Sequence, residues 1–349
     1  EELVAQLYER TSTSRGKPTI GITDEFTLKS LFPFFATYLY ELGYDLVIRS
    51  GADQAVLKRG IEEANVPFCA PMQQYHGLVA TLAEQQAPDQ LFMPMIRNLP
   101  RSGDEEVTAL CPIVQGSPDV MRLDLASSTS TTILTPIVDI GPDNLTGELF
   151  VRSCAGIAAE LGVDEPVWRA AYERARTAQD RFDEECFLLG ERALAFCEEN
   201  GIVPIVVLGR AYTIYNTVLN SNVPALVREQ GALPIPVDCY RVSDDTPLFE
   251  DVYWGYAQRS LRAAHQLRRS PRLYSIYCSN HACGPDSFNL HYFAYAKQGR
   301  PFAIIETDGH SGDAGTKTRI EAFLHCVAED LAHDGPATHP ADFRLIELA

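Results

Sequence analysis

Short apolar runs alternate with amphipathic stretches along most of this 349-residue chain. An apolar run bounded by turn residues is typical of a buried strand, whereas apolar residues at helical spacing are typical of a helix that packs on a core. Where strands and helices alternate in sequence, parallel sheets covered by helices on both faces are favoured. The pattern therefore predicts an α/β protein with two doubly wound, Rossmann- or flavodoxin-like parallel-sheet domains.

Each half of the chain shows this alternation. In the first half we expect helices at 26–42 and 52–64, and strands at 18–22, 44–48 and 90–96. In the second half we expect strands at 202–208, 232–236, 273–278 and 302–306, with helices at 218–230, 253–269, 287–297 and 317–331.

A long helix is predicted between the halves. The segment 164–200 opens with Asp, Glu and Pro and is followed by Gly201, which are residues that start and stop helices. We therefore expect an N-terminal domain at 1–150, a helical connector at 151–200 and a C-terminal domain at 201–349. The Ser- and Thr-rich segment 126–135 is predicted to be a loop or a crossing between domains.

Acidic residues outnumber basic ones by 47 to 29, which gives a formal net charge of −18. Such a charge repels phosphate backbones and anionic lipid surfaces, so we expect neither nucleic acid nor a membrane as a partner. The sequence has no apolar stretch of about 20 residues, and its opening Glu1-Glu2-Leu3 lacks the pattern of a signal sequence. We expect a cytoplasmic protein, and the oligomeric state stays open, a dimer included.

The nine cysteines fit a reducing compartment better than a disulfide framework, because their number is odd and no secretory signal precedes them. Some are expected to be ordinary core residues, since a free cysteine behaves as a small hydrophobic side chain. Those predicted to pack inertly inside helices or a strand are Cys186, Cys197, Cys326 and Cys278, whereas Cys154 and Cys239 lie in no supporting motif.

Three other cysteines, Cys69, Cys111 and Cys283, are each followed within two residues by proline. Each also follows an apolar run that could be a strand, and ligands of open α/β sheets bind at the carboxyl ends of the strands. Three thiolates meeting there could hold three irons of a [4Fe–4S] cluster and leave the fourth iron open.

Two alternatives to a cluster stay open. The first is zinc, which thiolates also suit, with His76, His281 or His310 as the fourth ligand. The second is a single nucleophilic cysteine, Cys111 or Cys283, which would leave the other Cys-Pro motifs unexplained.

Other polar residues are candidates for binding or catalysis. His310 lies between Asp308 and Asp313 and could act as a general acid, although the same residues are also suited to capping a helix. Arg210 follows a predicted strand and could bind a phosphate or carboxylate of a substrate, or pair with one of the many acidic side chains. Asn280 precedes Cys283 and is a second candidate for substrate binding. The sequence has no G-x-S-x-G elbow, no G-x-G-x-x-G fingerprint after a strand and no complete phosphate loop.

Longer motifs carry a resemblance to a known family. They comprise Cys111-Pro-Ile-Val-Gln-Gly116, Tyr253-Trp-Gly-Tyr-Ala-Gln258, Asn280-His-Ala-Cys-Gly-Pro-Asp-Ser-Phe288, the segment 306–315 and Thr318-Arg-Ile-Glu-Ala-Phe323. With the opening Ile20-Gly-Ile22, they resemble, over roughly residues 17–330, the iron–sulfur domain family related to 2-hydroxyacyl-CoA dehydratase components. Members of that family occur with, or fused to, the ATP-dependent acyl-CoA dehydratase activase.

The resemblance implies a [4Fe–4S] cluster at the domain interface, with Cys69, Cys111 and Cys283 as its ligands. It also implies electron transfer from the ATP-dependent activase, used for radical dehydration or reduction of an acyl-CoA or another small substrate. The protein would then be a component of an anaerobic lyase or of a low-potential reductase. The alternatives are a non-catalytic electron relay or scaffold that docks the activase, and a zinc-stabilised α/β binding protein.

Overall fold

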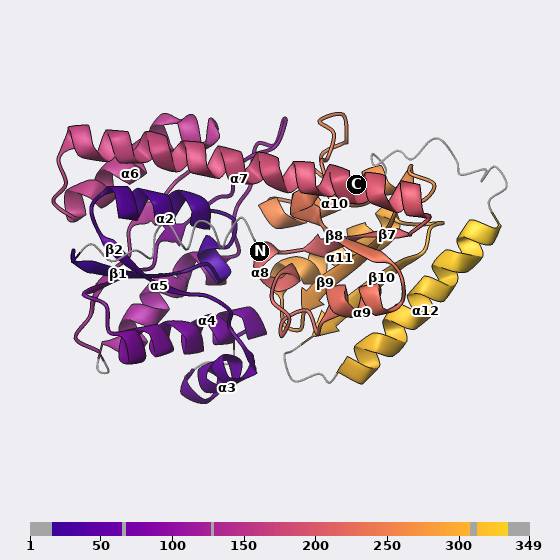
Figure 1. Ribbon diagram of the computed structural model, residues 1–349, viewed down its shortest axis with the longest axis horizontal. Helices are drawn as coiled ribbons and strands as arrows, with labels where there is room; N and C mark the ends of the chain where they lie inside the picture. The colour runs from indigo at the N-terminus through magenta and orange to yellow at the C-terminus, as the bar shows by residue number, and fades with distance from the viewer. Residues whose placement is uncertain (1–15, 65–67, 127–128, 308–312, 334–349) are drawn as a thin grey trace.

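Two four-stranded parallel sheets, each covered by helices, form the body of the protein (Figure 1). The computed structural model describes residues 16–64, 68–126, 129–307 and 313–333. The prediction of an α/β fold with doubly wound parallel sheets is confirmed. In each sheet, the strand that comes first in sequence has the second strand on one side, at the edge of the sheet. The third and fourth strands in sequence lie on its other side.

The first sheet has the order β2-β1-β3-β5. Its strands are β1 (Thr19–Thr23), β2 (Asp45–Arg49), β3 (Gln90–Phe92) and β5 (Thr132–Leu134). The sheet therefore takes in part of the segment 126–135, so the prediction of a loop there is wrong at its C-terminal end. Thr and Ile, which are β-branched, fit the pleated surface of a strand.

The predicted strand 90–96 is divided between two sheets. β3 belongs to the first sheet, whereas β4 (Met95–Ile96) pairs with β6 (Ile137–Val138) in a separate two-stranded parallel sheet. Pro94 separates β3 from β4, and Pro136 separates β5 from β6. Backbone hydrogen bonds from the N–H of Met93 to Leu134 and from that of Met95 to Pro136, both 2.9 Å, nevertheless continue the pairing of the two segments past these prolines.

The helices of the first half are η1 (Phe26–Leu28), α2 (Phe32–Glu41), α3 (Gln54–Glu63), α4 (Ala70–Thr81), the π-helical turn η2 (Leu82–Gln86), α5 (Pro112–Leu125), η3 (Asn144–Thr146) and α6 (Glu148–Glu160). The single helix predicted at 26–42 is thus broken. Phe26 has a positive φ of 53°, and Pro33 lies in the first turn of α2, where proline starts a helix rather than continuing it.

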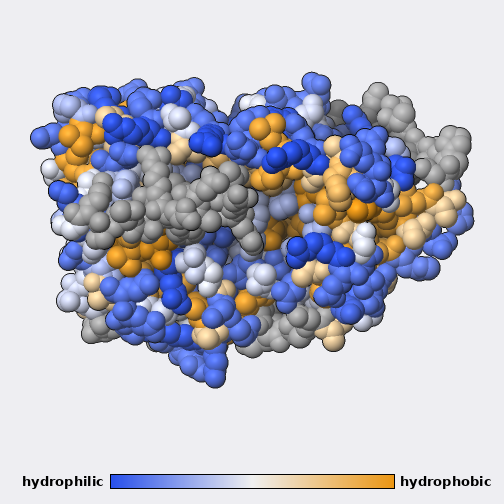
Figure 2. All heavy atoms as spheres, in the orientation of Figure 1, coloured by the Kyte–Doolittle hydropathy of each residue, from blue (hydrophilic) through white to orange (hydrophobic). Residues whose placement is uncertain are grey.

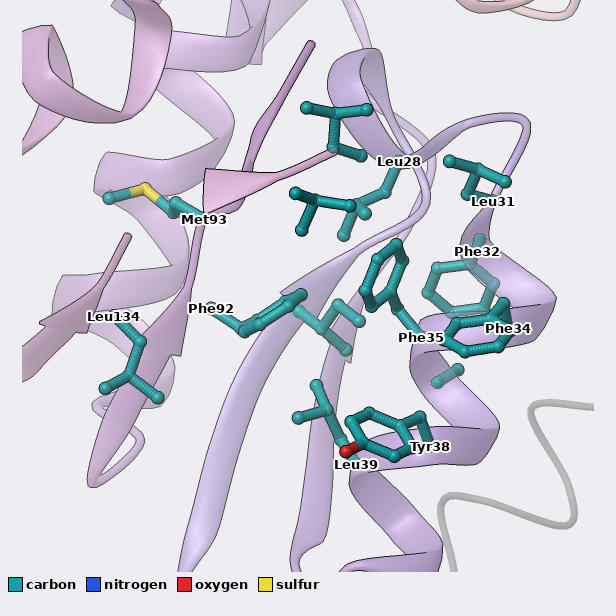
Figure 3. Close-up of a cluster of buried hydrophobic side chains, with 14 of the residues drawn as sticks. Leu28, Leu31, Phe32, Phe34, Phe35, Tyr38, Leu39, Phe92, Met93 and Leu134 are labelled. Carbon is teal, nitrogen blue, oxygen red and sulfur yellow. The ribbon is translucent and has the colours of Figure 1, made fainter. Parts of the chain in front are cut away.

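Aromatic side chains of α2 fill the space between this helix and the first sheet (Figure 3). Phe35 contacts Phe92 of β3 with ring centroids 5.4 Å apart, and Phe34 contacts Phe150 of α6 at 4.8 Å. All four rings are buried. Aromatic burial of this kind supplies a large share of core stability.

The second sheet has the order β10-β9-β7-β8. Its strands, β7 (Pro204–Gly209), β8 (Leu233–Pro236), β9 (Tyr274–Asn280) and β10 (Phe302–Thr307), lie within two residues of the predicted positions. The remaining elements are α8 (Ala211–Ile214), α9 (Val223–Glu229), η4 (Val237–Cys239), α10 (Gly255–Arg268), α11 (Gly284–Ala296) and α12 (Asp313–Ala332). The helix predicted at 218–230 begins only at Val223, because Ser221 and Asn222 have positive φ angles.

The long helix α7 (Glu165–Asn200) runs alongside both sheets (Figure 1). Its 36 residues correspond to roughly 54 Å at 1.5 Å per residue. Gly201 ends it in the left-handed conformation with a φ of 64°, as the sequence predicts. Gln179 of α7 accepts a hydrogen bond from the backbone N–H of Phe34 at 3.1 Å, which fixes α7 against α2.

Hydrophilic side chains dominate the face of the molecule in Figure 2. Within the described ranges, no helix is both long enough and apolar enough to cross a membrane.

Candidate functional site

Cys69, Cys111 and Cys283 each occupy the residue that precedes the first turn of a helix. They are the N-caps of α4, α5 and α11, and in each case a proline lies at the first or second helical position. The first N–H groups of a helix have no intrahelical acceptor, so proline is tolerated there. The Cys-Pro motif is therefore a helix start that fixes the direction of the cysteine side chain.

The expectation that all three cysteines follow strands holds for Cys283, is wrong for Cys111 and falls largely outside the described residues for Cys69. Cys283 follows β9 after a short turn, in which Ala282 has a φ of 63°. Cys111 follows no regular strand: Ala109 forms only isolated bridges to Asn98 and Trp254. Cys69 comes after α3, and residues 65–67 before it lie outside the described residues.

The fold brings these three thiols into one electrostatic neighbourhood. The thiol of Cys69 interacts with those of Cys111 and Cys283, and the guanidinium of Arg210 interacts with Cys69 and Cys283. Two of the cysteines belong to the first half of the chain and the third follows the second sheet. Cys69 thus lies within electrostatic reach of both other thiols, near the carboxyl edge of β7 and β9.

Burial controls the protonation of two of these thiols. It raises the pKa of Cys283 to about 12, with Arg210 acting in the opposite direction. Burial also raises the pKa of Cys69, against the backbone N–H of Met72 and the charge of Arg210. As free thiols both would stay protonated at neutral pH, so a ligand that requires thiolates must displace their protons.

Three helix N-termini add positive potential at this point. Each N-terminus carries about half a positive elementary charge from the aligned peptide dipoles. The helices that start at the three cysteines are 12, 14 and 13 residues long. Their first turns therefore favour an anionic group near the sulfurs.

Arg210 is buried beside the cysteines and is paired within the protein. Its guanidinium lies 2.9 Å from the carboxylate of Asp286 and donates to Oδ1 of Asn280 at 3.0 Å. It also lies over the ring of Tyr212, 5.3 Å from the centroid. The ion-pair alternative for Arg210 is thus the arrangement that the structure contains. Asp286, in the first turn of α11, was not singled out as its partner in the sequence.

Asn280 is held by protein groups on both sides of its amide. Its Oδ1 also accepts from the hydroxyl of Thr213 at 2.8 Å, and its Nδ2 donates to the carbonyl of Leu219 at 2.9 Å and to Oγ1 of Thr307 at 3.1 Å. These contacts join β9, β10 and the segments after α8. Asn280 therefore stabilises the edge of the second sheet beside Cys283.

Aromatic rings pack together beside Arg210, around Tyr212. Tyr212 contacts Phe26 and Tyr256 with centroids 5.0 and 5.7 Å apart, and the Tyr256 hydroxyl lies 2.8 Å from that of Ser30. The adjoining cavity measures about 10 Å³, which is room for about one water molecule.

Glu25 is a buried carboxyl group on the lining of this small cavity. Burial raises its pKa to about 6, although Lys29 at 3.5 Å acts to lower it. Burial also raises the pKa of Tyr75 on the same lining, but Glu25 titrates much closer to neutral pH.

The histidines expected as additional ligands do not join the cysteines in the described structure. Nε2 of His76 lies 3.2 Å from Asp124, and His281 is exposed. His310, the candidate general acid, lies outside the described residues. Within the described ranges, no three His, Cys, Asp or Glu side chains are arranged to hold a metal ion.

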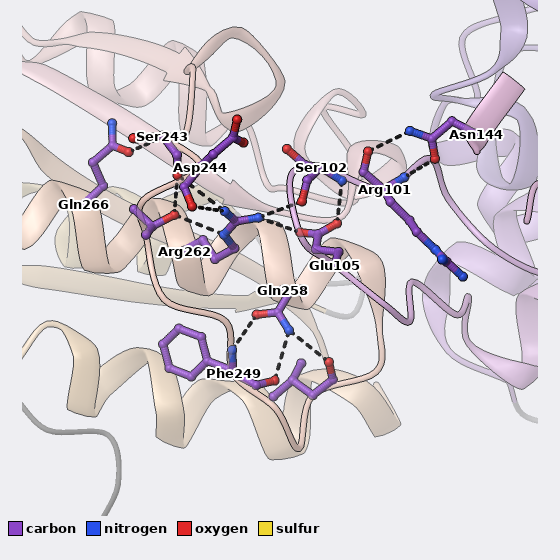
Figure 4. A network of polar contacts seen from close by, with 12 residues as sticks. Arg101, Ser102, Glu105, Asn144, Ser243, Asp244, Phe249, Gln258, Arg262 and Gln266 are labelled. Atoms are coloured by element: carbon purple, nitrogen blue, oxygen red, sulfur yellow. Dashed lines mark hydrogen bonds and ion pairs between the residues drawn. The ribbon is translucent and has the colours of Figure 1, made fainter. Parts of the chain in front are cut away.

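The Tyr253–Gln258 motif holds the segment that leads to Cys111. Ala109 donates to the carbonyl of Tyr253 at 2.7 Å and accepts from the N–H of Gly255 at 3.2 Å. A Cβ on Gly255 would lie 3.1 Å from Cβ of Thr108, so a larger residue would require a small shift of this neighbour. Gln258 then fixes the preceding loop through the backbone of Phe249 (Figure 4).

One prediction for the remaining cysteines is wrong, because Cys326 is exposed on α12 rather than buried. Cys186 of α7 is buried as predicted, and its thiol lies within electrostatic reach of Cys239. No local sequence motif indicates that Cys186 and Cys239 are close, because they lie on different elements. Cys154, Cys197 and Cys278 are buried.

A larger cavity, of about 500 Å³, lies at the junction of both halves and α7. Its lining comprises Ser102, Glu105, Phe187, Val237, Asp238, Tyr240, Arg241, Val242, Ser243, Asp244, Arg259 and Arg262. Cys69, Cys111 and Cys283 do not line it, so this space is separate from the three-cysteine site.

Comparisons with known proteins identify a family but no characterised relative. No curated protein matches the chain. Among solved structures, the crystal structure of ZnuA is 11% identical, with a TM-score of 0.27 over 89% of this chain and 98% of that one. A zinc-bound deletion mutant of ZnuA is 11% identical, with a TM-score of 0.25 over 90% of this chain and 97% of that one.

The C-terminal domain of glucosamine-fructose-6-phosphate aminotransferase from Francisella tularensis is 8% identical, with a TM-score of 0.23 over 95% of this chain and 88% of that one. Scores at this level carry no argument about fold or function. Residues 19–240, more than half of the chain, match the family described as the CoA enzyme activase uncharacterised domain (DUF2229). The matched segment contains Cys69, Cys111 and Arg210. The chain therefore belongs to the CoA enzyme activase uncharacterised domain family.

Proposed function

We propose that this protein binds a [4Fe–4S] cluster through Cys69, Cys111 and Cys283 and accepts low-potential electrons from an ATP-dependent activase. Membership of a CoA enzyme activase family supports the activase context. The ligand set and the electron-transfer role go beyond that membership and are part of the proposal.

The observation that carries the proposal is the electrostatic interaction of Cys69 with both Cys111 and Cys283. The three thiols come from the starts of α4, α5 and α11, which are far apart in sequence. Thiolates are the usual protein ligands of iron–sulfur clusters.

The surroundings of the sulfurs also suit an anionic redox group. When bound, such a cluster supplies one-electron transfer. Cys283 and Tyr212 are buried, whereas Cys69 and Cys111 are half-buried, and Nε of Arg210 is a buried donor without a hydrogen-bond partner. Hydrogen bonds and dielectric around the sulfurs set the potential of iron–sulfur centres, so Arg210 is placed to influence it.

The small size of the neighbouring cavity favours an electron relay as a second candidate over direct catalysis. Ligand-binding pockets for small molecules typically enclose about 300–1,000 Å³, whereas the cavity beside Tyr212 measures about 10 Å³. In this alternative the protein docks the activase and passes electrons onward without binding a substrate itself.

Anaerobic reconstitution with iron and sulfide tests the proposal. We expect bound iron and acid-labile sulfide in the wild type and loss of most of both in Cys283→Ala, because one of three protein ligands is removed. Cys278→Ala is the matched control, since Cys278 is a buried cysteine five positions earlier in β9. Full iron retention in Cys283→Ala would place any cluster elsewhere.

The relay and the enzyme are separated by adding acyl-CoA to the reconstituted protein. A change in the paramagnetic spectrum of the reduced cluster would favour a substrate site, whereas an unchanged spectrum with several thioesters would favour the relay.

A further inference from the structure

Cys186 and Cys239 form a thiol pair between the long helix and the second sheet. Cys186 lies on α7, and Cys239 ends η4, which directly follows β8. Each thiol shifts the pKa of the other, and both are free cysteines. The pair is independent of the three Cys-Pro motifs and of the proposed electron-transfer role.

Gly190 explains why the two elements approach so closely. A Cβ on Gly190 would lie 1.6 Å from the carbonyl oxygen of Cys239 and 3.3 Å from its Cβ, so glycine alone permits this contact. Cys186 is four residues before Gly190, one turn away on the same face of α7, where Cβ atoms are about 5–6 Å apart. The backbone of Cys239 is therefore held directly against the turn that carries Cys186.

The two thiols differ in exposure, which suits ordered attack. Cys239 is half-buried, whereas Cys186 is buried. The more exposed thiol is the one that a small disulfide reaches first, and a buried neighbouring thiol is suited to resolve the product.

The cavity of about 500 Å³ lies next to the segments that carry this pair. Phe187 and Asp238, the sequence neighbours of the two cysteines, line it, although the cysteines themselves do not. Arg241 and Arg259 also line it, and they pair with Glu184 at 3.3 Å and with Asp238 at 2.6 Å. A small disulfide that enters this cavity would therefore lie beside the segment that carries half-buried Cys239.

We propose that Cys186 and Cys239 form a reversible disulfide with a low-molecular-weight disulfide of the glutathione class as the oxidant. The Cys239 thiolate attacks one sulfur of glutathione disulfide, which forms a mixed disulfide and releases one glutathione thiolate. Cys186 then loses its proton and attacks the Cys239 sulfur, which releases the second glutathione. The protein loses two electrons and two protons, and glutathione disulfide is reduced to two thiols.

The disulfide would tie α7 to the carboxyl edge of the second sheet. Tyr215, at the end of α8, lies within electrostatic reach of Cys239, whereas Arg210, at the start of α8, pairs with Asp286. One short helix therefore separates the thiol pair from the three-cysteine site.

Peptide mapping of the full-length protein tests this inference. The wild type and Cys186→Ser are incubated with glutathione disulfide, alkylated and digested with trypsin. Trypsin releases Cys186 within residues 182–192 and Cys239 within residues 229–241, and each peptide contains one cysteine. We expect these peptides to be cross-linked in the wild type and separated by dithiothreitol. In Cys186→Ser the cross-link is lost, and Cys239 remains a mixed disulfide with glutathione.

Two comparisons keep the test specific. Exposed Cys326 should carry a stable mixed disulfide in both proteins, which confirms that the reagent is active. Gly190→Ala should reduce the wild-type cross-link, because the added methyl group displaces Cys239. A wild type in which Cys239 stays unmodified, or stays a glutathione adduct without cross-linking, would overturn the inference.

Discussion

At the scale of single residues, the described structure contains a buried ammonium group that opposes folding. Lys297 is fully buried at the end of α11, and its Nζ has no hydrogen-bond partner. Burial lowers its pKa to about 7. Repulsion from Arg300 and Arg268 acts in the same direction, whereas attraction by Asp330 acts to raise the pKa. The unfolded chain, with an ordinary lysine pKa near 10.4, therefore binds more protons than the folded protein between about pH 7 and pH 10.

This imbalance predicts that Lys297→Met stabilises the protein. The free energy of unfolding of the wild type should rise with pH over that window, because its unfolded state loses the protons that favour it. Lys297→Met should be more stable by about 2–4 kcal/mol at pH 7, with a flatter pH dependence. Urea denaturation at about pH 7 and pH 9.5 measures both effects.

Exposed Lys58→Met on α3 is the control and should change stability by less than about 0.5 kcal/mol. Equal effects of the two substitutions would contradict the prediction.

At the scale of elements, two glycines let α3 and α4 touch through their backbones. A Cβ on Gly77 would lie 2.1 Å from the carbonyl oxygen of Val56, and a Cβ on Gly60 would lie 1.7 Å from that of Gln73. Since α4 begins at Cys69, this crossing also helps to determine where that thiol lies.

We therefore expect Gly77→Ala to destabilise the protein by about 1–3 kcal/mol, because the two helices must move apart. The same movement should weaken iron retention after reconstitution. Gly156→Ala on α6 is a matched control, because a Cβ there meets no atom within 4 Å. The helix propensity of alanine should make that control neutral or more stable by up to about 1 kcal/mol. Thermal unfolding of both variants decides between these outcomes.

At the scale of the whole molecule, a buried ion pair joins the halves beside the larger cavity. Arg262 of α10 lies 3.2 Å from Glu105 and donates to the carbonyl of Ser102 at 3.0 Å (Figure 4). It also donates to Oγ1 of Thr246. Ser102 and Glu105 belong to the segment that leads to Cys111, so this pair links the second half to the position of a candidate ligand.

Arg262→Ala should cost about 3–5 kcal/mol, because it leaves the buried carboxylate of Glu105 without its counter-charge. Arg152→Ala removes an exposed i,i+4 pair with Glu148 and should cost less than about 1 kcal/mol. Chemical denaturation of each variant gives the comparison. A small cost for Arg262→Ala that matches the surface control would show that the pair does not hold the halves together.

The sequence by itself determined the alternation of strands and helices, the parallel α/β class and the long helix that ends at Gly201. Apolar periodicity, caps and turn residues act over a few neighbouring positions, so they are visible without a fold. The same local chemistry marked the Cys-Pro motifs, although it did not show that each of them starts a helix.

Only the tertiary structure decided which distant groups meet. It divided the strand predicted at 90–96 between two sheets, paired Arg210 with Asp286 and brought Cys69 into the electrostatic reach of Cys111 and Cys283. It also placed Cys186 against Cys239 through the gap at Gly190. Such contacts depend on how whole elements pack and on which polar groups are buried together, and no short stretch of sequence encodes that packing.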